Sequence, residues 1–314
     1  MSDAIGAWSE RELVSVTGPD AESFLQGQLS QDVATLGVGG SRWSLLLEPS
    51  GRMVARLRVH RTGDESFVLD VTAGWGGVVR SRLDRFRLRV ACELGEPRVA
   101  RTLLVRGVLD PPQSGHGTRL RGVAGTPSIA STGGEPVGLV GFDLVDLEAS
   151  AEFAPPDGLR VDPDRVEALR VAAGVPEMDS EIDDSVIPAE LGPWLVEQSV
   201  SWTKGCYTGQ ELVARVDSRG GNVPRRLRRL RVGTVPVTAG TPVFTLDGIE
   251  AGRVTSVAGG VALGLLGRRV GHDDQVTVIG SIVPVEAIEP ITVVSDADGV
   301  TPGIDGPGRA PEGR

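Results

Sequence analysis

The sequence predicts an α+β protein that ends in a small antiparallel β-barrel. Strand and helix patterns alternate over residues 1–225, whereas residues 226–292 hold only short strand patterns separated by glycine, proline and aspartate. At 314 residues, the chain is also longer than one hydrophobic core usually supports. We therefore expect two or three domains, followed at residues 293–314 by a disordered tail that lacks apolar content.

Composition narrows the class of protein. The net charge of -10 argues against direct nucleic-acid binding and against binding to anionic membranes, because both need a positive surface. The sequence has no apolar run of about 18 to 20 residues, and its start does not resemble a secretory signal. The two cysteines lie far apart in the chain. We therefore expect a cytoplasmic protein with reduced thiols and no membrane segment.

The first elements follow from local patterns. The stretch "LVSVTGPDAESFLQGQL" predicts a strand and then a helix, with Pro19 and Asp20 suited to the first helical turn. In "WSLLLEPSGRMVARLRVH", two apolar runs flank the turn residues 49–51, as in a hairpin. "SFVLDVTA" predicts a further strand, and the apolar residues Val79, Leu83 and Phe86 indicate a short helix after it.

The middle of the chain gives four more expectations. The alternation in "RLRVACEL" predicts a half-buried strand, which makes Cys92 a core residue. Residues 110–136 are rich in glycine, proline, serine and threonine and predict mostly loop, and "VGFDLVDLEA" predicts a strand. A helix is expected from Asp162 and Pro163 to Gly174, where glycine favours the exit. An acidic segment follows it.

The stretch "SWTKGCYTGQELVARV", residues 201–216, contains one of the two cysteines. Part of it fits a helix start. Thr208 and Glu211 have the spacing of a capping box, and Tyr207 and Leu212 have the spacing of a hydrophobic staple. Gly205 suits a turn. This interpretation leaves two residues of the stretch without a role.

Those residues are Lys204 and Cys206. A thiol just before a helix N-terminus, two residues from a lysine, is in a place that favours thiolate over thiol. Redox chemistry, transient ligation of a soft metal or cluster, and contact with a bound ligand all remain open, as does an inert cysteine that supports the turn. The three histidines carry no protease signature, and no metal-ligand spacing surrounds Cys206.

Other candidate binding residues are better explained by a structural role. The five arginines in residues 225–231 could contact an anionic ligand or RNA, but a solvated strand face is favoured. The acidic residues 179–184 could bind a metal, although such a run is more often a solvated loop. Trp194 and Trp202 could stack on a flat heterocycle, but core packing is favoured for either one alone.

The octapeptide "KGCYTGQE" resembles the signature of the YgfZ family of folate-binding proteins. These proteins are relatives of the glycine-cleavage T-protein, an aminomethyltransferase, and their mitochondrial cousins serve iron-sulfur protein maturation. The resemblance continues through "VTGPDAESFLQGQLSQDV", "PSGRMVARLRV", "LRVAAGVPEMDSEIDDSVIPAEL" and "GRVTSVA", so it covers nearly the whole chain except the tail.

The resemblance implies a T-protein-like ring of three domains around a folate-binding channel. Residues 1–225 would form two interleaved α+β domains, and the barrel of residues 226–292 would close the ring. The cofactor implied is tetrahydrofolate or a derivative. Glu181 would accept hydrogen bonds from the pterin ring, and Arg215 would bind a folate carboxylate. The remaining implied site residues are Tyr207 and Trp202 for folate contact, with Cys206 and Lys204 for chemistry.

Two departures from the T-protein pattern bear on activity. No Asp or Glu occurs between Val71 and Leu83, where the T-protein pattern has its catalytic aspartate. Val166 stands where some YgfZ members have a tryptophan, so Trp8, Trp194 and Trp202 are alternative aromatic contacts. These departures argue against classical aminomethyl transfer by this chain.

We therefore expect a monomeric, cytoplasmic folate-binding protein that supports iron-sulfur cluster assembly or repair. Its partners would be a reduced folate and iron-sulfur client or assembly proteins, with only an indirect effect on tRNA modification. Two other hypotheses remain open: a folate-dependent one-carbon transferase, and a folate-binding scaffold without chemistry.

Overall fold

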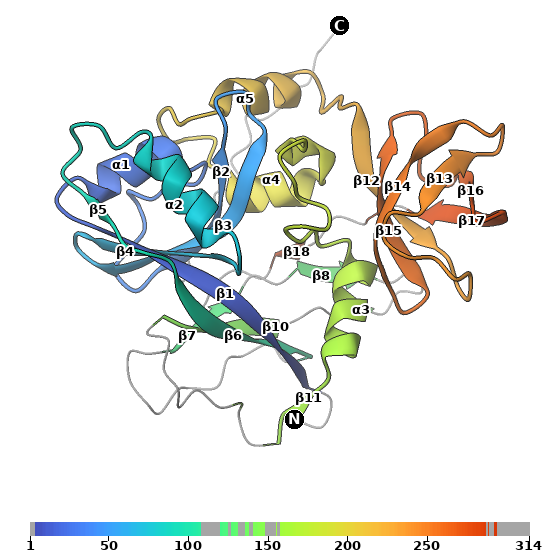
Figure 1. The fold of residues 1–314 in the computed structure, drawn as a ribbon, viewed down its shortest axis with the longest axis horizontal. Coiled ribbons are helices and arrows are strands. Elements are labelled where there is room, and N and C mark those ends of the chain that lie inside the picture. The colour runs from blue at the N-terminus through green and yellow to red at the C-terminus, as the bar shows by residue number, and fades with distance from the viewer. Residues whose placement is uncertain are drawn as a thin grey trace, which may run out of the picture.

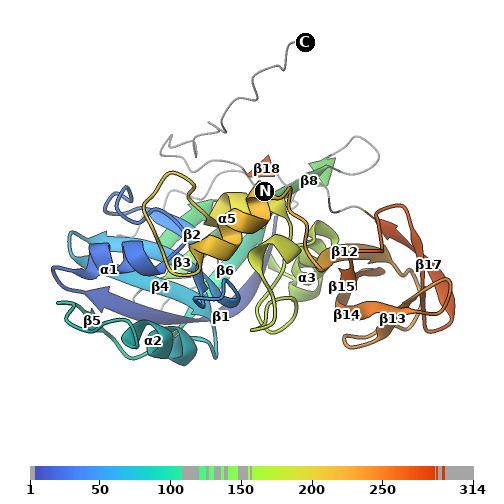
Figure 2. The same ribbon diagram turned by 90° about the horizontal axis from the view of Figure 1, so that it is seen from above.

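The computed structural model describes residues 4–107, 120–124, 127–130, 136–137, 141–147, 155, 158–286, 288 and 292–293. A long sheet with helices on it forms one part of the molecule, and a closed barrel forms the other (Figure 1). Helix α3 (Pro163–Ala173) contacts strands of both parts. Figure 2 shows the same arrangement from above.

The sheet has nine strands, seven of them in the order β2-β3-β4-β1-β6-β10-β7. Their bounds are β1 (Ile5–Thr17), β2 (Ser41–Leu47), β3 (Met53–Gly63), β4 (Ser66–Thr72), β6 (Arg98–Arg106), β7 (Leu120–Ala124) and β10 (Gly141–Asp146). The short strands β5 (Glu93–Leu94) and β11 (Arg160–Val161) pair with β1. Neighbours along the main path are antiparallel, and β2 and β3 form the predicted hairpin.

Helices α1 (Ala21–Gln28) and α2 (Gly76–Asp84) pack on the sheet and share its main core cluster. Phe24 and Leu25 of α1 and Val79 and Leu83 of α2 are buried there. The same cluster includes residues of helix α4 (Pro193–Ser199) and of helix α5 (Gln210–Ser218). A 3-10 turn, η1 (Pro188–Glu190), precedes α4. The late helices therefore fold back onto the first sheet rather than onto the barrel.

The predicted helix after residue 162 is confirmed together with its caps. The Asp162 carboxylate accepts a hydrogen bond from the Arg165 N–H at 3.0 Å, at the start of α3. Gly174 ends the helix with a φ of 68°, a conformation that glycine adopts without strain. Both signals are local, which is why the sequence alone located this helix.

The C-terminal strands close into a six-stranded antiparallel barrel, as predicted. Its order is β12-β15-β14-β13-β16-β17, with bounds β12 (Arg225–Arg231), β13 (Pro242–Thr245), β14 (Glu250–Ala258), β15 (Val261–Gly267), β16 (Gln275–Val278) and β17 (Ser281–Glu286). On β12, Arg225 pairs with Glu190, while Arg229 and Arg231 pair with Glu286. These arginines thus have partners within the chain.

Two predictions about the middle of the chain are wrong in part. Residues 87–94 do not form a full strand: Leu88 is 84% exposed, and Arg89 has a φ of 62°, which breaks the extended backbone. Cys92 is nevertheless buried, as predicted. The stretch expected to be mostly loop contains β7, β8 (Pro127–Ala130) and β9 (Pro136–Val137), and β8 pairs with β18 (Thr292–Val293).

Three further expectations concern the tail, the domain boundaries and membrane segments. The tail beyond residue 293 lies outside the described residues. The division of the chain into domains at residues 225 and 292 stays a prediction. Among the described helices, none combines the length and the apolar character of a membrane-spanning segment.

Candidate functional site

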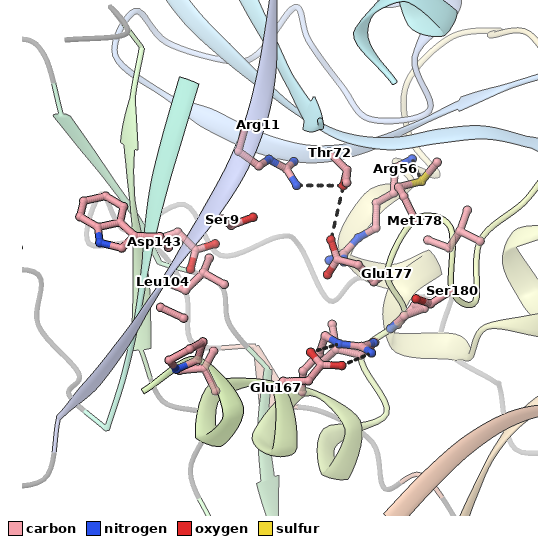
Figure 3. Close-up of a pocket in the computed structure, with 18 of the residues that line it drawn as sticks. Ser9, Arg11, Arg56, Thr72, Leu104, Asp143, Glu167, Glu177, Met178 and Ser180 are labelled. Atoms are coloured by element: carbon pink, nitrogen blue, oxygen red, sulfur yellow. Dashed lines mark hydrogen bonds and ion pairs between the residues drawn. The ribbon is translucent and has the colours of Figure 1, made fainter. Parts of the chain in front are cut away.

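A cavity of about 440 Å³ lies where β1, β3, β6 and β10 face helix α3 and the loop that follows it (Figure 3). This volume is within the usual range for small-molecule sites. Trp8 and Trp43 contribute aromatic surface to its lining, and Val166 of α3 contributes aliphatic surface. Val166 therefore faces the cavity, and Trp8, one of the aromatic contacts considered from the sequence, lines it as well.

A buried network of charges supports one wall of the cavity. Asp70 pairs with Arg11 at 2.6 Å and with Arg58 at 2.6 Å. Asp143 pairs with Arg58 at 2.8 Å and with Arg106 at 2.9 Å. Burial alone would raise the pKa of Asp70, but the neighbouring guanidiniums outweigh it and hold that pKa well below its usual range. Both carboxylates are thus ionised structural partners of the arginines.

Arg56 differs from those arginines. Its guanidinium stacks on Trp43 at 4.0 Å from the ring centroid and lies 5.4 Å from that of Trp194. One terminal nitrogen donates to Gln198 Oε1 at 2.9 Å, whereas the buried Nε has no hydrogen-bond partner among the described residues. Burial lowers the pKa of Arg56 to about 10, although the charge of Glu177 acts in the opposite direction. Trp194, considered from the sequence as a ligand contact, is a buried support for Arg56.

The carboxylate that lines the cavity after α3 belongs to Glu177. It directly follows Pro176 in the turn after Gly174, and Figure 3 shows it among the lining residues. Thr72 Oγ1 accepts a hydrogen bond from Arg11 at 3.1 Å and donates to Glu177 Oε1 at 3.4 Å. Glu177 is partly exposed and keeps accepting capacity for a ligand.

Glu181, the residue assigned to the pterin ring from the sequence, has a different position. It is 1% exposed and is absent from the cavity lining. Its Oε1 accepts from the hydroxyls of Ser256 at 2.6 Å and Thr255 at 2.7 Å. Its Oε2 accepts from Arg170 at 3.1 Å and from the Glu177 N–H at 3.0 Å. The carboxylate therefore joins the loop after α3 to the barrel and has no oxygen free for a ligand.

The signature stretch does start a helix, but the predicted cap is wrong. Helix α5 begins at Gln210, and its N-cap residue is Gly209, which has a φ of 85° and no capping side chain. A Cβ at this position would lie 2.7 Å from the Glu48 carbonyl oxygen, so the close approach to the β2–β3 hairpin requires glycine. Thr208 therefore lies one residue before the N-cap. The residues predicted to form the capping box and the hydrophobic staple are thus each one position away from where those motifs require them. The Gln210 side chain accepts the Tyr207 N–H at 3.1 Å instead.

Lys204 does have a capping role, at a different helix. Its ammonium donates to the carbonyl oxygens of Gln26 at 2.6 Å, Leu29 at 2.6 Å and Gln31 at 3.0 Å. These carbonyls lie at and beyond the C-terminus of α1, where backbone acceptors lack helical partners. Burial lowers the pKa of Lys204 to about 8, against the charge of Asp32.

None of the six residues selected from the sequence lines the cavity. Cys206 and Arg215 are exposed, so the thiol does not face a channel at this place. Tyr207 is buried in the core, which raises its pKa to about 12. Trp202 is 49% exposed and lines a second cavity of about 390 Å³ beside α5, together with Leu212.

Most residues that line the first cavity carry no local sequence signal. Arg11 lies on β1, Arg56 and Arg58 lie on β3, and Arg106 lies on β6, and no local motif connects these three strands in the sequence. Only Glu177 had a usable signal, because it directly follows the G-x-P turn. Over the described part of the chain, no group of three or more His, Cys, Asp or Glu residues could hold a metal ion, so the acidic segment 179–184 gives no support for a metal site.

Comparison with known proteins supports the T-protein-like fold expected from the sequence. No model of a protein family matches the chain. A crystal structure of the glycine cleavage system aminomethyltransferase T from Bartonella henselae superposes with a TM-score of 0.67 at 22% identity, over 92% of this chain and 87% of that one. The chain thus has the aminomethyltransferase T fold.

Two sequence relatives are named for iron-sulfur cluster assembly and for tRNA modification. A mitochondrial iron-sulfur cluster assembly factor IBA57 homolog of Neurospora crassa is 27% identical over 220 residues, which cover 68% of this chain and 50% of that protein. A tRNA-modifying protein YgfZ of Photorhabdus laumondii is 29% identical over 225 residues, covering 67% and 65% of the two chains. These similarities, all below 30% identity, make the chain a relative of the YgfZ and IBA57 proteins, and the matches span 50% and 65% of these two proteins.

Proposed function

We propose that the protein binds a reduced folate in the first cavity and supports the assembly or repair of iron-sulfur clusters. The observation that carries this proposal is the cavity itself: it combines a partly exposed carboxylate, Glu177, with the aromatic rings of Trp8 and Trp43. The names of the relatives support the cellular role, one as an iron-sulfur cluster assembly factor and one as a tRNA-modifying protein. An effect on tRNA modification would be indirect, through iron-sulfur enzymes.

The lining residues fit a folate-type ring. A carboxylate can accept two parallel hydrogen bonds from a ring N–H and a neighbouring amino group, and Glu177 is free to do so. Trp8 and Trp43 add aromatic surface beside a flat heterocycle, while Arg101 lies over the ring of Trp8 and Arg56 over that of Trp43. In this proposal Glu177, and not Glu181, accepts the hydrogen bonds from the pterin ring. Arg215, Tyr207 and Trp202 lie outside this binding site.

We assign the functional thiol to Cys206. It is the exposed one of two free cysteines, since Cys92 is buried. A thiolate is a ligand that iron-sulfur clusters prefer, and an exposed one can reach a cluster carried by another protein. The cluster would be cargo, and Cys206 would act at the surface rather than in the folate cavity. Lys204 supports this segment through its three carbonyl contacts.

The test of the thiol is complementation in a strain that lacks the gene. Cys206→Ser should fail to restore the activity of iron-sulfur enzymes, including those that methylthiolate tRNA, while tetrahydrofolate binding remains. Cys92→Ala is the matched control, because it removes the buried thiol. Full restoration by Cys206→Ser would remove Cys206 from the proposal and favour a folate-binding scaffold. Folate binding itself is measured by anaerobic titration with tetrahydrofolate, read by tryptophan fluorescence.

The alternative is a folate-dependent one-carbon transferase, which the aminomethyltransferase fold favours. The absence of Asp and Glu between Val71 and Leu83 argues against it, and Thr72 is the polar residue that reaches the cavity from the end of β4. Purified protein supplied with tetrahydrofolate and an aminomethyl donor distinguishes the two functions. Clear turnover would establish the transferase.

The proposal also includes the location of the protein, its oligomeric state, its partners and its domains. We propose a cytoplasmic monomer whose protein partners are iron-sulfur client or assembly proteins. Direct binding to nucleic acid is not expected at a net charge of -10. The division into a folate-binding region of residues 1–225 and a barrel of residues 226–292 can be tested by limited proteolysis.

A further inference from the structure

Arg56 differs from the other arginines that line the cavity in whether a carboxylate forms an ion pair with it. The others each pair with a carboxylate at 2.6 to 3.1 Å: Arg11, Arg58, Arg106 and Arg170. Within the described part of the chain, Arg56 forms no ion pair, and its one side-chain hydrogen bond goes to the neutral amide of Gln198. A buried cation with so few acceptors is costly unless a ligand supplies one.

The orientation of this guanidinium is fixed. Stacking on Trp43 sets its plane, and the bond to Gln198 sets its rotation. Nε is buried and has no hydrogen-bond partner among the described residues, and the donor that this lining residue has left for a cavity ligand is its second terminal nitrogen, Nη1. The donor is therefore prepared for an acceptor that the described residues do not provide.

The same wall of the cavity carries the carboxylate. The backbone N–H of Arg56 lies 3.5 Å from the sulfur of Met178, the residue after Glu177. Figure 3 shows Arg56, Glu177 and Met178 grouped on one side of the cavity. The charge of Glu177 acts on the Arg56 guanidinium, so an acceptor-only group and a donor-only group share this wall of the cavity.

We infer that Arg56 determines the ring specificity of this cavity by donating a hydrogen bond to the 4-oxo oxygen of a 2-amino-4-oxo heterocycle. The adjacent N3–H and 2-amino group of the same ring donate to Glu177. The inference rests on the proposed folate site and adds a specificity-determining residue to it. A 4-amino analogue presents a donor to Arg56, so that contact is lost, and it lacks the N3–H, so Glu177 keeps only the 2-amino group as a donor.

The experiment compares two ligands that differ only at this position: tetrahydrofolate and its 4-amino-4-deoxy analogue, titrated anaerobically against the full chain. The intact protein should bind the 4-oxo ligand more tightly by about 10- to 100-fold, the range for a hydrogen bond to a charged group. Arg56→Met should weaken tetrahydrofolate binding by a similar factor and remove most of the preference. Arg56→Lys should recover little of it, because an ammonium lacks the planar fork of donors that stacking on Trp43 orients.

Arg253→Met is the matched control, since Arg253 is exposed on the barrel and lies outside the cavity. It should leave both affinities unchanged. Equal affinity of the intact protein for the two ligands would overturn the inference without any variant, even if Arg56→Met folds poorly. An unchanged preference in folded Arg56→Met would also overturn it, while folate binding stands. If neither ligand binds, the proposed folate site itself fails.

Discussion

The Glu181 carboxylate accepts a hydrogen bond from the Ser256 hydroxyl at 2.6 Å, which joins the loop after α3 to strand β14 of the barrel. Arg170 completes the junction, because it donates to Glu181 and also to the Ser256 hydroxyl at 2.7 Å. Two parts of the chain that are distant in sequence thus share one buried carboxylate. The cavity residue Glu177 is held by the same group, through its N–H.

This junction predicts a difference between two neighbouring glutamates. Glu181→Gln should lower the free energy of unfolding by about 3 kcal/mol, because it removes the charge that several buried donors share. Glu177→Gln should lower it by less than about 1 kcal/mol but weaken tetrahydrofolate binding. Urea unfolding and folate titration of both variants test this. The reverse pattern, with stability lost in Glu177→Gln and binding lost in Glu181→Gln, would return the pterin contact to Glu181.

The contrast also shows what the sequence can predict. Helix α3 was located correctly because its signals, Asp162 and Gly174, are adjacent to the helix they cap. The barrel was located by its repeated short strands. The cavity could not be predicted in this way, because Arg58 meets Asp143 only after β3 and β10 take their places in one sheet. Long-range register, rather than local pattern, builds the site.

The buried Asp70 predicts a dependence of stability on pH. Its folded-state pKa is lowered, so its stabilising contribution is complete above the unfolded-state pKa of about 4. That contribution is lost as the pH falls through the folded-state pKa. Asp70→Asn should cost about 3 to 5 kcal/mol at pH 7, since it leaves Arg11 and Arg58 without this partner, and less at pH 3.

Unfolding by urea at pH 7, 4 and 3 measures the effect for both proteins. The curve of stability against pH should be flatter for Asp70→Asn than for the unaltered chain below pH 4. Parallel loss of stability in the two proteins would mean that other carboxylates, such as Asp143, carry the acid sensitivity.

Lys204 predicts a structural rather than a chemical phenotype. Lys204→Met should destabilise the protein by about 1 to 3 kcal/mol, because three backbone carbonyls lose their shared donor. Amide exchange of the last turn of α1 should accelerate as well. Folate binding should persist, since Lys204 does not line the cavity. A variant of full stability that fails only in complementation would instead give Lys204 a role beside Cys206.

The two glycines of the signature predict opposite outcomes for the same substitution. Gly209 has a φ of 85°, and a Cβ there would lie 2.7 Å from the Glu48 carbonyl oxygen and 2.8 Å from Leu47 Cβ. Gly209→Ala should therefore cost about 2 kcal/mol or more, from backbone strain and overpacking together. Gly205 has open space around it and no positive φ, so Gly205→Ala should change stability by about 0.5 kcal/mol or less.

Urea unfolding of the two alanine variants, followed by complementation, connects this difference to Cys206. The contact of Gly209 with the β2–β3 hairpin fixes where α5 begins, and the exposed thiol lies three residues before that glycine. If the position of the thiol matters, Gly209→Ala should reduce the rescue of iron-sulfur enzymes more than a similarly destabilising change in the barrel core, for which Leu230→Ala serves as the reference. Equal rescue by both variants would indicate that stability alone governs the phenotype, and that the close packing of Gly209 serves the fold rather than the thiol.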